Sequence, residues 1–377
     1  MSRWSNLHPD ILSEIIERIK NPCDHIRCSS ICSSWRSVAK RHRPALPHSI
    51  PGIMLSPRHS LYRNFIPLPH NSPPSKYIHH QQHLDLDVSR SDTCCGSYQG
   101  WLVLLVKRRS ICLHNPFSKQ HRLLPTLDKD VYKAVLSSSP SFDTNCVVLI
   151  LFQTNGAAFC RLGDDSWKNL ECYGYYSGFS DALFFGGKFY VVDDYGRIYA
   201  CNVGDTILEQ IEPQPSDISK MTRYKFYLVE IQGLLCRIVR KFLLDEEFYY
   251  NCDIIYADYD DRVSFPVSTR EFRVSRMDRV TNKWVPVYNL GGYAIFLGCG
   301  NSFSLSELEM GGGVMKRNRI YFMDDRQMNT KHFGLDFPGR DMGIYDMMDM
   351  SIEPLFSDPL NELMDYPPAV WVTPLPW

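Results

Sequence analysis

A loose repeat of strands and turns runs through most of this 377-residue chain and limits how it can fold. The segments "NPFSKQHRLL" (115–124) and "DRVTNKWVPV" (278–287) share one form: an Asn or Asp, an apolar residue two places later, a Ser or Thr, and a return to apolar residues. Shorter or fainter copies begin near residues 164, 202 and 349. The five starts are separated by 49, 38, 76 and 71 residues, which corresponds to one or two periods of about 40–50 residues.

A period of this length is typical of the blades of WD- and kelch-type β-propellers. It predicts about six blades over roughly 280 residues, and radial repetition would leave only short, protected sheet edges. "QGWLVLLVKRRSICLHN" (99–115) and "GKFYVVDDYGRIYACNV" (187–203) each read as two strands around a turn, as such blades require. A pair of β-sandwiches is the alternative fold for the same strands.

Aromatic residues give two further expectations for the body. Trp167 and Trp284 lie in copies of the repeat, and we expect them to anchor blade cores rather than to bind a ligand. Near the C-terminus, "AVWV" (369–372) predicts a strand that closes the ring by joining an early blade. A frayed, Pro-rich end is the alternative for this segment.

The first forty residues differ from the rest because their apolar residues recur with a helical period. In "NLHPDILSEIIERI" (6–19), Pro9 fits the first helical position. The apolar residues of this helix form one stripe at i, i+3, i+4 and i+7, namely Leu12, Ile15, Ile16 and Ile19.

A second short helix is expected over "SSICSSWRSVA" (29–39), where the apolar residues again have helical spacing. Two helices this short can bury one face against each other but little more. Leu7, Ile11 and Trp35 are then surplus apolar surface. Such a surplus marks either a partner's docking site or a contact with the body of the same chain.

The order of residues in these two helices resembles an F-box. Leu7-x-Pro9 and Ile31-Cys32-x-x-Trp35-Arg36 carry the likeness, and His8 splits the usual Leu-Pro pair. The resemblance covers residues 3–44, gives a first domain at 1–44, and implies binding to the Skp-type adaptor of a cullin–RING ubiquitin ligase. The adaptor-binding residues that it implies are Leu7, Pro9, Ile11, Leu12, Ile15, Ile16, Ile19, Ile31, Cys32 and Trp35.

The body is similar to the β-propeller domain that follows the F-box in a large plant-specific group, a domain long catalogued as one of unknown function. The likeness runs over residues 95–345 in motifs such as "GSYQGWLVLL" and "FRVSRMDRVTNKWVPVYNLGGYAIFLG". It implies a plant protein with a six- or seven-bladed propeller, placed at 95–377, and it carries no catalytic residues. The expected fold class is α+β and multidomain, with a small helical F-box before a mainly-β propeller of about six blades.

Residues 45–94 are rich in Pro, His and Ser, and we expect a connector that can contribute an edge strand to the body. The run "HHQQH" (79–83), followed by Asp85 and Asp87, is compatible with a metal site. A helix would be needed to align its histidines, and the Pro-rich surroundings argue against one. We therefore expect a solvated loop and no metal.

Composition excludes several classes of protein. Lys plus Arg (41) and Asp plus Glu (42) nearly balance, unlike the basic footprint of a nucleic-acid binder. The longest apolar run, "VVLILF" (147–152), has the length of a strand rather than a membrane span, and the N-terminus has no secretory h-region. The 13 cysteines are scattered without a CxxC pair, so we expect a reduced intracellular protein in the nucleus, the cytoplasm or both.

Few patterns point to catalysis. The Asp pairs at 164–165, 193–194, 260–261 and 324–325 lie between expected strands, where Asp is typical of turns. The glycine-rich segments "GCGNSF" (298–303) and "EMGGGVMK" (309–316) complete no phosphate-binding motif. We expect no catalytic residue and no cofactor.

The sequence thus favours a non-catalytic substrate receptor of an SCF-type ubiquitin ligase, in which the helices bind the adaptor and the propeller binds an unknown protein. Such a receptor acts by raising the effective concentration of its target near the ubiquitin-conjugating enzyme. An interaction protein that uses the propeller outside a ligase is the first alternative. A propeller enzyme or sugar binder is the second.

Overall fold

The structure is a computed structural model of the 377-residue chain. It describes residues 4, 7–19, 28–29, 31–42, 51–55, 61–68, 84–89, 91–107, 109–153, 156–172, 178–212, 215, 224–244, 267–278, 280–281, 283–310, 315–324, 341–355 and 369–373. Within these ranges, no helix combines the length and the apolar character that crossing a membrane would require.

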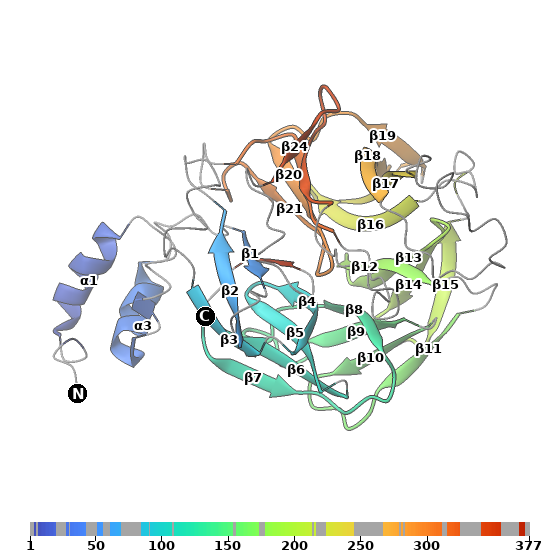
Figure 1. Ribbon diagram of the computed structural model, residues 1–377. Helices are drawn as coiled ribbons and strands as arrows, with labels where there is room; N and C mark the ends of the chain where they lie inside the picture. The colour runs from blue at the N-terminus through green and yellow to red at the C-terminus, as the bar shows by residue number, and fades with distance from the viewer. Residues whose placement is uncertain are drawn as a thin grey trace, which may run out of the picture.

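Two helices are described at the N-terminal end, α1 (Pro9–Arg18) and α3 (Ser33–Arg41), beside the ring of strands (Figure 1). α1 begins as predicted, because Pro9 lies in its first turn, where a missing N–H is tolerated. α3 begins later than predicted. The extended backbone of its N-cap residue, Cys32, excludes both Ile31 and Cys32 from the helix.

The described strands form five sheets, which Figure 1 shows arranged around a ring. The first sheet has the order β25–β1–β2–β3, with β25 (Val370–Val372), β1 (Gly52–Leu55), β2 (Tyr62–Pro67) and β3 (Leu84–Ser89). The second contains β4 (Thr93–Tyr98), β5 (Trp101–Val106), β6 (Ser110–Asn115) and β7 (Gln120–Leu123). A third contains β16 (Tyr224–Ile231), β17 (Leu234–Leu244), β18 (Val267–Met277) and β19 (Trp284–Val287). A fourth has the order β21–β20–β22–β23–β24, with β20 (Tyr293–Leu297), β21 (Phe303–Ser306), β22 (Arg319–Phe322), β23 (Gly343–Asp346) and β24 (Ile352–Pro354).

The remaining sheet has eight strands in two antiparallel groups. The first group contains β8 (Val131–Leu136), β9 (Val147–Phe152), β10 (Ala157–Arg161) and β11 (Lys168–Cys172). The second contains β12 (Phe179–Phe185), β13 (Lys188–Asp193), β14 (Ile198–Asn202) and β15 (Ile207–Glu212). A short parallel pairing between β11 and β15 joins the groups, with Glu171 opposite Ile207. The predicted hairpins at 99–115 and 187–203 are confirmed as β5–β6 and β13–β14.

Apolar clusters fill the spaces between neighbouring groups of strands. Trp101 of β5 packs in one cluster with Val148 of β9, and Phe226 of β16 packs in another with Val192 of β13. Along the ring, β25 contacts β4, β4 contacts β8, β8 contacts β12, β12 contacts β16, and β16 contacts β21. The body is therefore a mainly-β propeller whose sheets pack face to face around a common centre.

The ring is closed by the two ends of the propeller sequence. β25 pairs with β1 in antiparallel fashion, with Trp371 opposite Ile53. Trp371 is fully buried, and its indole N–H donates to the carbonyl oxygen of Leu297 at 2.9 Å. The Ser97 hydroxyl donates to the Trp371 carbonyl oxygen at 2.8 Å, which ties the closing strand to the next sheet. The predicted closing strand at 369–372 is thus confirmed.

The connector expected over residues 45–94 contains three paired strands, β1 to β3, instead of a single edge strand. The expectation of a single strand followed from the prolines of this segment. Those within the described part stand at positions where strands tolerate proline. Pro51 precedes β1, and Pro67 is the last residue of β2. The run "HHQQH" at 79–83 lies outside the described residues.

Four of the five copies of the sequence repeat lie at the turn between the third and fourth strands of a four-stranded group, and the copy near residue 349 lies at the turn between β23 and β24. The side chain of Asn115 accepts hydrogen bonds from the N–H groups of Phe117 and Ser118, each at 3.0 Å. Asp278 accepts from the N–H groups of Val280 and Thr281 in the same way. The leading Asn or Asp therefore fixes an Asx turn in these two copies.

Candidate functional site

The helix pair has a small apolar core of its own. Leu12 and Ile16 of α1 and Trp35, Val38 and Ala39 of α3 are buried against one another. The Trp35 indole N–H donates to the carbonyl oxygen of Trp4 at 2.9 Å, so the segment before α1 is tied to α3. These five side chains hold the pair together and cannot at the same time contact a partner.

The ten residues predicted to bind the adaptor therefore divide into two sets. Leu12, Ile16 and Trp35 form the internal core, and Leu7, Ile15, Ile19 and Cys32 are half-buried beside it. Pro9, Ile11 and Ile31 are exposed, with Ile11 at 51% and Ile31 at 50%. Periodicity alone did not separate the sets, because α1 carries apolar residues on two adjacent faces. The exposed residues, together with the accessible parts of the half-buried ones, are the part of the prediction that can contact a partner.

His8, which splits the usual Leu-Pro pair, has a structural role. It is the N-cap of α1, and its imidazole Nδ1 accepts a hydrogen bond from the Asp10 N–H at 3.5 Å. The Asp10 carboxylate lies 3.2 Å from the same ring, near the positive end of the helix dipole. The helix therefore begins normally despite the altered motif.

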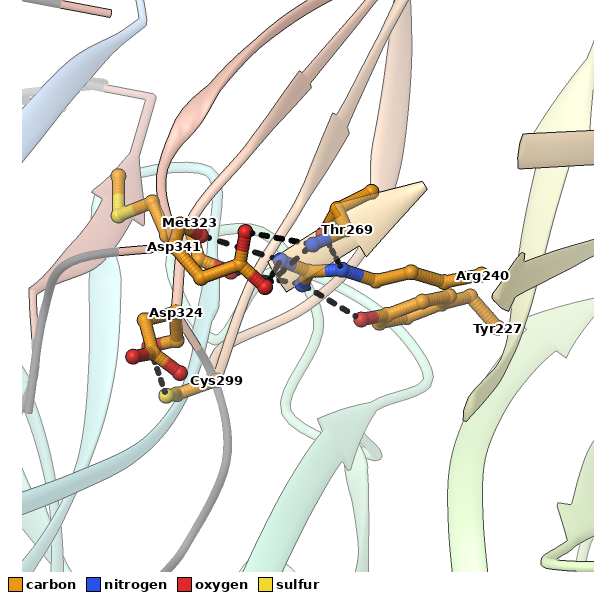
Figure 2. A network of polar contacts seen from close by, with 7 residues as sticks. All are labelled: Tyr227, Arg240, Thr269, Cys299, Met323, Asp324 and Asp341. Atoms are coloured by element: carbon orange, nitrogen blue, oxygen red, sulfur yellow. Dashed lines mark hydrogen bonds and ion pairs between the residues drawn. The ribbon is translucent and has the colours of Figure 1, made fainter. Parts of the chain in front are cut away.

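A buried polar network lies between the sheets of β16–β19 and β20–β24, as Figure 2 shows. The Arg240 guanidinium, which is fully buried, donates to the Asp341 carboxylate at 3.0 Å and to the Met323 carbonyl oxygen at 2.9 Å. It also donates to the hydroxyls of Thr269 and Tyr227. The ion pair spans 101 residues of sequence, and no local pattern indicates it.

A second buried ion pair joins β8 and β12. Lys133 of β8 pairs with Asp181 of β12, and both side chains are almost wholly buried. Asp181 also accepts hydrogen bonds from the Leu228 N–H at 3.0 Å and from the Ser302 hydroxyl at 3.2 Å. One carboxylate thus connects four groups of strands, which is typical of a structural anchor rather than a reactive group.

The Asp pairs form no acid–base dyad within the described residues. Asp193 accepts hydrogen bonds from the N–H groups of Tyr195 and Arg197, which confirms its predicted role in a turn. It is also 1% exposed and 2.5 Å from the Arg197 guanidinium, so it belongs to the core. Burial, reinforced by Asp193, raises the pKa of Tyr199 to about 12. The pair at 260–261 lies outside the described part of the chain.

The remaining chemical candidates are thiols and aromatic rings. No disulfide joins any two cysteines in the described ranges, and burial raises the pKa of Cys94 to about 11 and of Cys236 to about 12. No group of three possible metal ligands occurs among the described residues. The Trp167 indole N–H donates to Pro125, and Trp284 packs under the Arg237 guanidinium, so both act as the predicted anchors.

Comparisons with known proteins agree with both halves of this architecture. A family model of the F-box domain matches residues 4–45, and one of the KIB1-4 beta-propeller matches residues 66–346. The chain is 25% identical over 348 residues to the putative F-box protein At5g55150 of Arabidopsis thaliana, with 86% of each chain covered. It is 22% identical over 426 residues to the F-box protein SKIP23 of the same plant, covering 99% of this chain and 96% of that one.

Solved structures resemble the chain only weakly. The beta-propeller domain of Cps50 (Swd1) from Myceliophteria thermophila aligns with 10% sequence identity and a TM-score of 0.37, over 76% of this chain and 77% of that one. A likeness of this size carries no argument about the present protein.

Proposed function

Because this chain belongs to the plant F-box proteins that carry a KIB1-4 β-propeller, we propose that it is the substrate-recognition subunit of an SCF-type ubiquitin ligase. F-box proteins with a propeller are in general substrate receptors of such ligases. In this role, the helix pair binds a Skp-type adaptor and through it a cullin–RING ligase. The propeller binds the target protein, and the chain itself performs no chemistry.

The observation that carries the proposal is the apolar surface left on a helix pair that has already formed its core. Ile11 and Ile15 lie one turn apart on α1, and Ile11 and Ile31 are half-exposed although the chain has a large core elsewhere. A free pair this small would gain stability by covering that surface. A partner with an apolar groove supplies such a cover.

The propeller supports the second half of the proposal by its size and closure. We take the eight-stranded sheet as two blades, which gives six blades with an apolar cluster at each of six successive interfaces. We place the start of this domain near residue 51, before β1, rather than at 95. A closed ring holds its connecting loops on a rigid frame, as a recognition surface requires.

The described cysteines are compatible with the proposed location. No disulfide joins any two of them, as expected for the reducing interior of the nucleus or the cytoplasm. The alternative of an interaction protein outside a ligase rested on the altered Leu7–Pro9 motif. His8 as N-cap shows that α1 still begins at this motif, and adaptor capture is the measurement that decides between the two functions.

Adaptor capture by full-length variants tests the proposal. Replacing Ile11 and Ile31 with Asp puts charge on exposed positions, so the helix pair should still fold. Capture of a purified plant Skp-type adaptor should fall at least about tenfold, since each buried apolar side chain contributes about 1.5–3 kcal/mol. The matched control is Leu123→Asp, at an exposed apolar position on β7, which should capture as wild type does. Undiminished capture by the Ile11/Ile31 variant would contradict the proposal.

A further inference from the structure

Two fully buried arginines of the propeller differ in how their guanidinium groups are satisfied. Arg240 donates to the Asp341 carboxylate, to a backbone carbonyl oxygen and to two hydroxyls. Among the described residues, Arg63 of β2 has a single acceptor, the carbonyl oxygen of Asp92, which lies 2.6 Å from Nη2. The Nε and Nη1 atoms of Arg63 are buried without an acceptor there. Because buried donors in native proteins are almost always paired, the Arg63 site is incomplete.

The positive charge of Arg63 is as poorly matched as its N–H groups. Burial lowers the pKa of Arg63, yet a guanidinium stays protonated at neutral pH. Asp92 is the one described carboxylate whose charge acts on it, and no hydrogen bond joins the two side chains in the described part of the chain. A water molecule would offer an acceptor but no charge. A guanidinium withdrawn from solvent in this way calls for a partner that carries negative charge.

The thiols near Arg63 do not supply that charge. Cys94, Cys95 and Cys299 lie close enough to act on it electrostatically. Burial raises the pKa of Cys94 to about 11 and raises that of Cys95 as well, so both thiols are neutral at pH 7. Each of the three sulfurs donates its S–H to a backbone carbonyl oxygen. The surroundings of the guanidinium are therefore apolar or weakly polar.

The site lies where three sheets meet, beside the strand that closes the ring. Arg63 comes from β2, two of the neighbouring thiols come from β4, and Cys299 comes from the connection between β20 and β21. The next residue, Gly300, approaches β25 so closely that a Cβ there would lie 2.8 Å from a methyl carbon of Val370. The turn between β3 and β4 supplies the bonded carbonyl oxygen, and its residue Ser91 is exposed, so the guanidinium lies close beneath the surface.

We infer that Arg63 binds a small oxyanion, such as a phosphate or carboxylate group, whose oxygens accept hydrogen bonds from the unsatisfied N–H groups. Oxyanions suit this site because a planar guanidinium binds them through short, charge-assisted hydrogen bonds. The bound anion neutralises a charge at the junction of three sheets, and it therefore stabilises the propeller where the ring closes. This inference is independent of the proposed function.

Thermal unfolding of the full-length chain in chloride, inorganic phosphate and acetate, at equal pH and ionic strength, tests the inference. Phosphate, acetate or both should raise the melting temperature of the wild type by at least about 3 °C over chloride, and the rise should grow with concentration. The anion with the larger effect distinguishes a phosphate site from a carboxylate site. Phosphate also stabilises many proteins through exclusion from their surface, so the decisive quantity is the rise that depends on Arg63.

Substitutions at Arg63 isolate that quantity. Arg63→Met should lose the rise attributed to binding, and Arg63→Lys, which keeps a positive charge, should retain part of it. The matched control is Arg122→Met, at an exposed arginine on β7, which should respond to the anions as wild type does. Equal anion responses in wild type and Arg63→Met, or no response beyond chloride in the wild type, would overturn the inference.

The same melts in chloride compare the two buried arginines directly. Arg63→Met removes a buried charge that lacks a bonded anion, so it should melt no lower than wild type. Arg240→Met leaves the Asp341 carboxylate without its buried partner and should melt clearly lower. If Arg63→Met melted as low as Arg240→Met in chloride, the Arg63 guanidinium would already be satisfied without an anion, which would also overturn the inference.

Discussion

The helix pair and the propeller differ in how each obtains its stability. Five buried side chains hold α1 against α3, and part of the remaining apolar surface stays exposed. The propeller instead has six apolar clusters, two buried ion pairs and a closing strand that joins its sequence ends. Under the proposed function, a partner covers the exposed surface of the helix pair, whereas the propeller is closed by its own strands. A receptor that links an adaptor to a target needs both properties.

Loss of the closing tryptophan should have the largest effect on the propeller. Trp371→Ala removes a fully buried indole that packs edge-on against Phe296 at 5.3 Å, so the free energy of unfolding should fall by about 3–5 kcal/mol. Urea unfolding followed by circular dichroism measures the change. Trp167→Ala, at a half-buried anchor, should cost clearly less, and adaptor capture should be intact in both variants. Equal effects at the two tryptophans would contradict closure by β25.

The same substitution at Trp35 should affect adaptor capture and leave the stability of the propeller unchanged, the opposite of Trp371→Ala. Trp35→Ala removes the largest side chain of the five-residue core, which a unit this small cannot compensate. Adaptor capture should be lost, while the main unfolding transition, which reports the propeller, should stay where it is. A shift of the main transition as large as that of Trp371→Ala would show that the two regions are not independent.

The Asp193–Asp194 turn offers a smaller and sharper contrast. Asp193→Asn removes the charge that pairs with Arg197 in the core, so the free energy of unfolding should fall by about 1–3 kcal/mol. Asp194→Asn changes an exposed neighbour and should stay within about 0.5 kcal/mol of wild type. Urea titrations of the two variants, run in parallel with wild type, measure both changes in the free energy of unfolding. The sequence alone predicted for both substitutions the small loss of stability that is typical of a surface turn. Similar losses in the two variants would support that prediction and contradict the core role of Asp193.

Thiol alkylation distinguishes the two regions without any substitution. Because the thiolate is the reactive form, the raised pKa values of Cys94 and Cys236 keep these groups protonated and unreactive at pH 8. Cys32 is half-buried on the helix pair and should react with iodoacetamide before the buried Cys94 and Cys236. Mass spectrometry locates the label at each time point. Adaptor binding should slow the reaction of Cys32, and labelling of Cys94 before Cys32 would contradict the account.

The fold was predicted from the sequence as far as local patterns extend. The stripe of Leu12 and Ile16, the strand at 369–372 and the repeated Asx turns all follow from spacing and turn chemistry within a few residues. Of the three strands β1 to β3, the sequence predicted only a single edge strand, because proline excludes a helix but permits a strand that it borders. The split between buried Trp35 and exposed Ile11 was also missed, since it depends on how two helices pack.

The candidate sites were harder to predict because they join distant residues. Arg240 and Asp341 are 101 positions apart, and Asp181 and Ser302 are 121 apart, so no motif connects them. Each of these residues alone resembles an ordinary surface or core position. Only the closed propeller brings them together.

The central claim is that the helix pair binds the ligase and the propeller binds the target. Affinity purification from plant cells tests it most directly, with the full-length chain compared to a chain that lacks residues 1–44. The account predicts that the deletion removes the adaptor and the cullin but retains at least one other bound protein. That protein should have a short half-life in cells that overproduce the full-length chain and a longer one in cells that overproduce the deleted chain. In cells that overproduce neither chain, its half-life should be intermediate. Equal half-lives in all three conditions would contradict the ligase function and favour an interaction protein that acts outside a ligase.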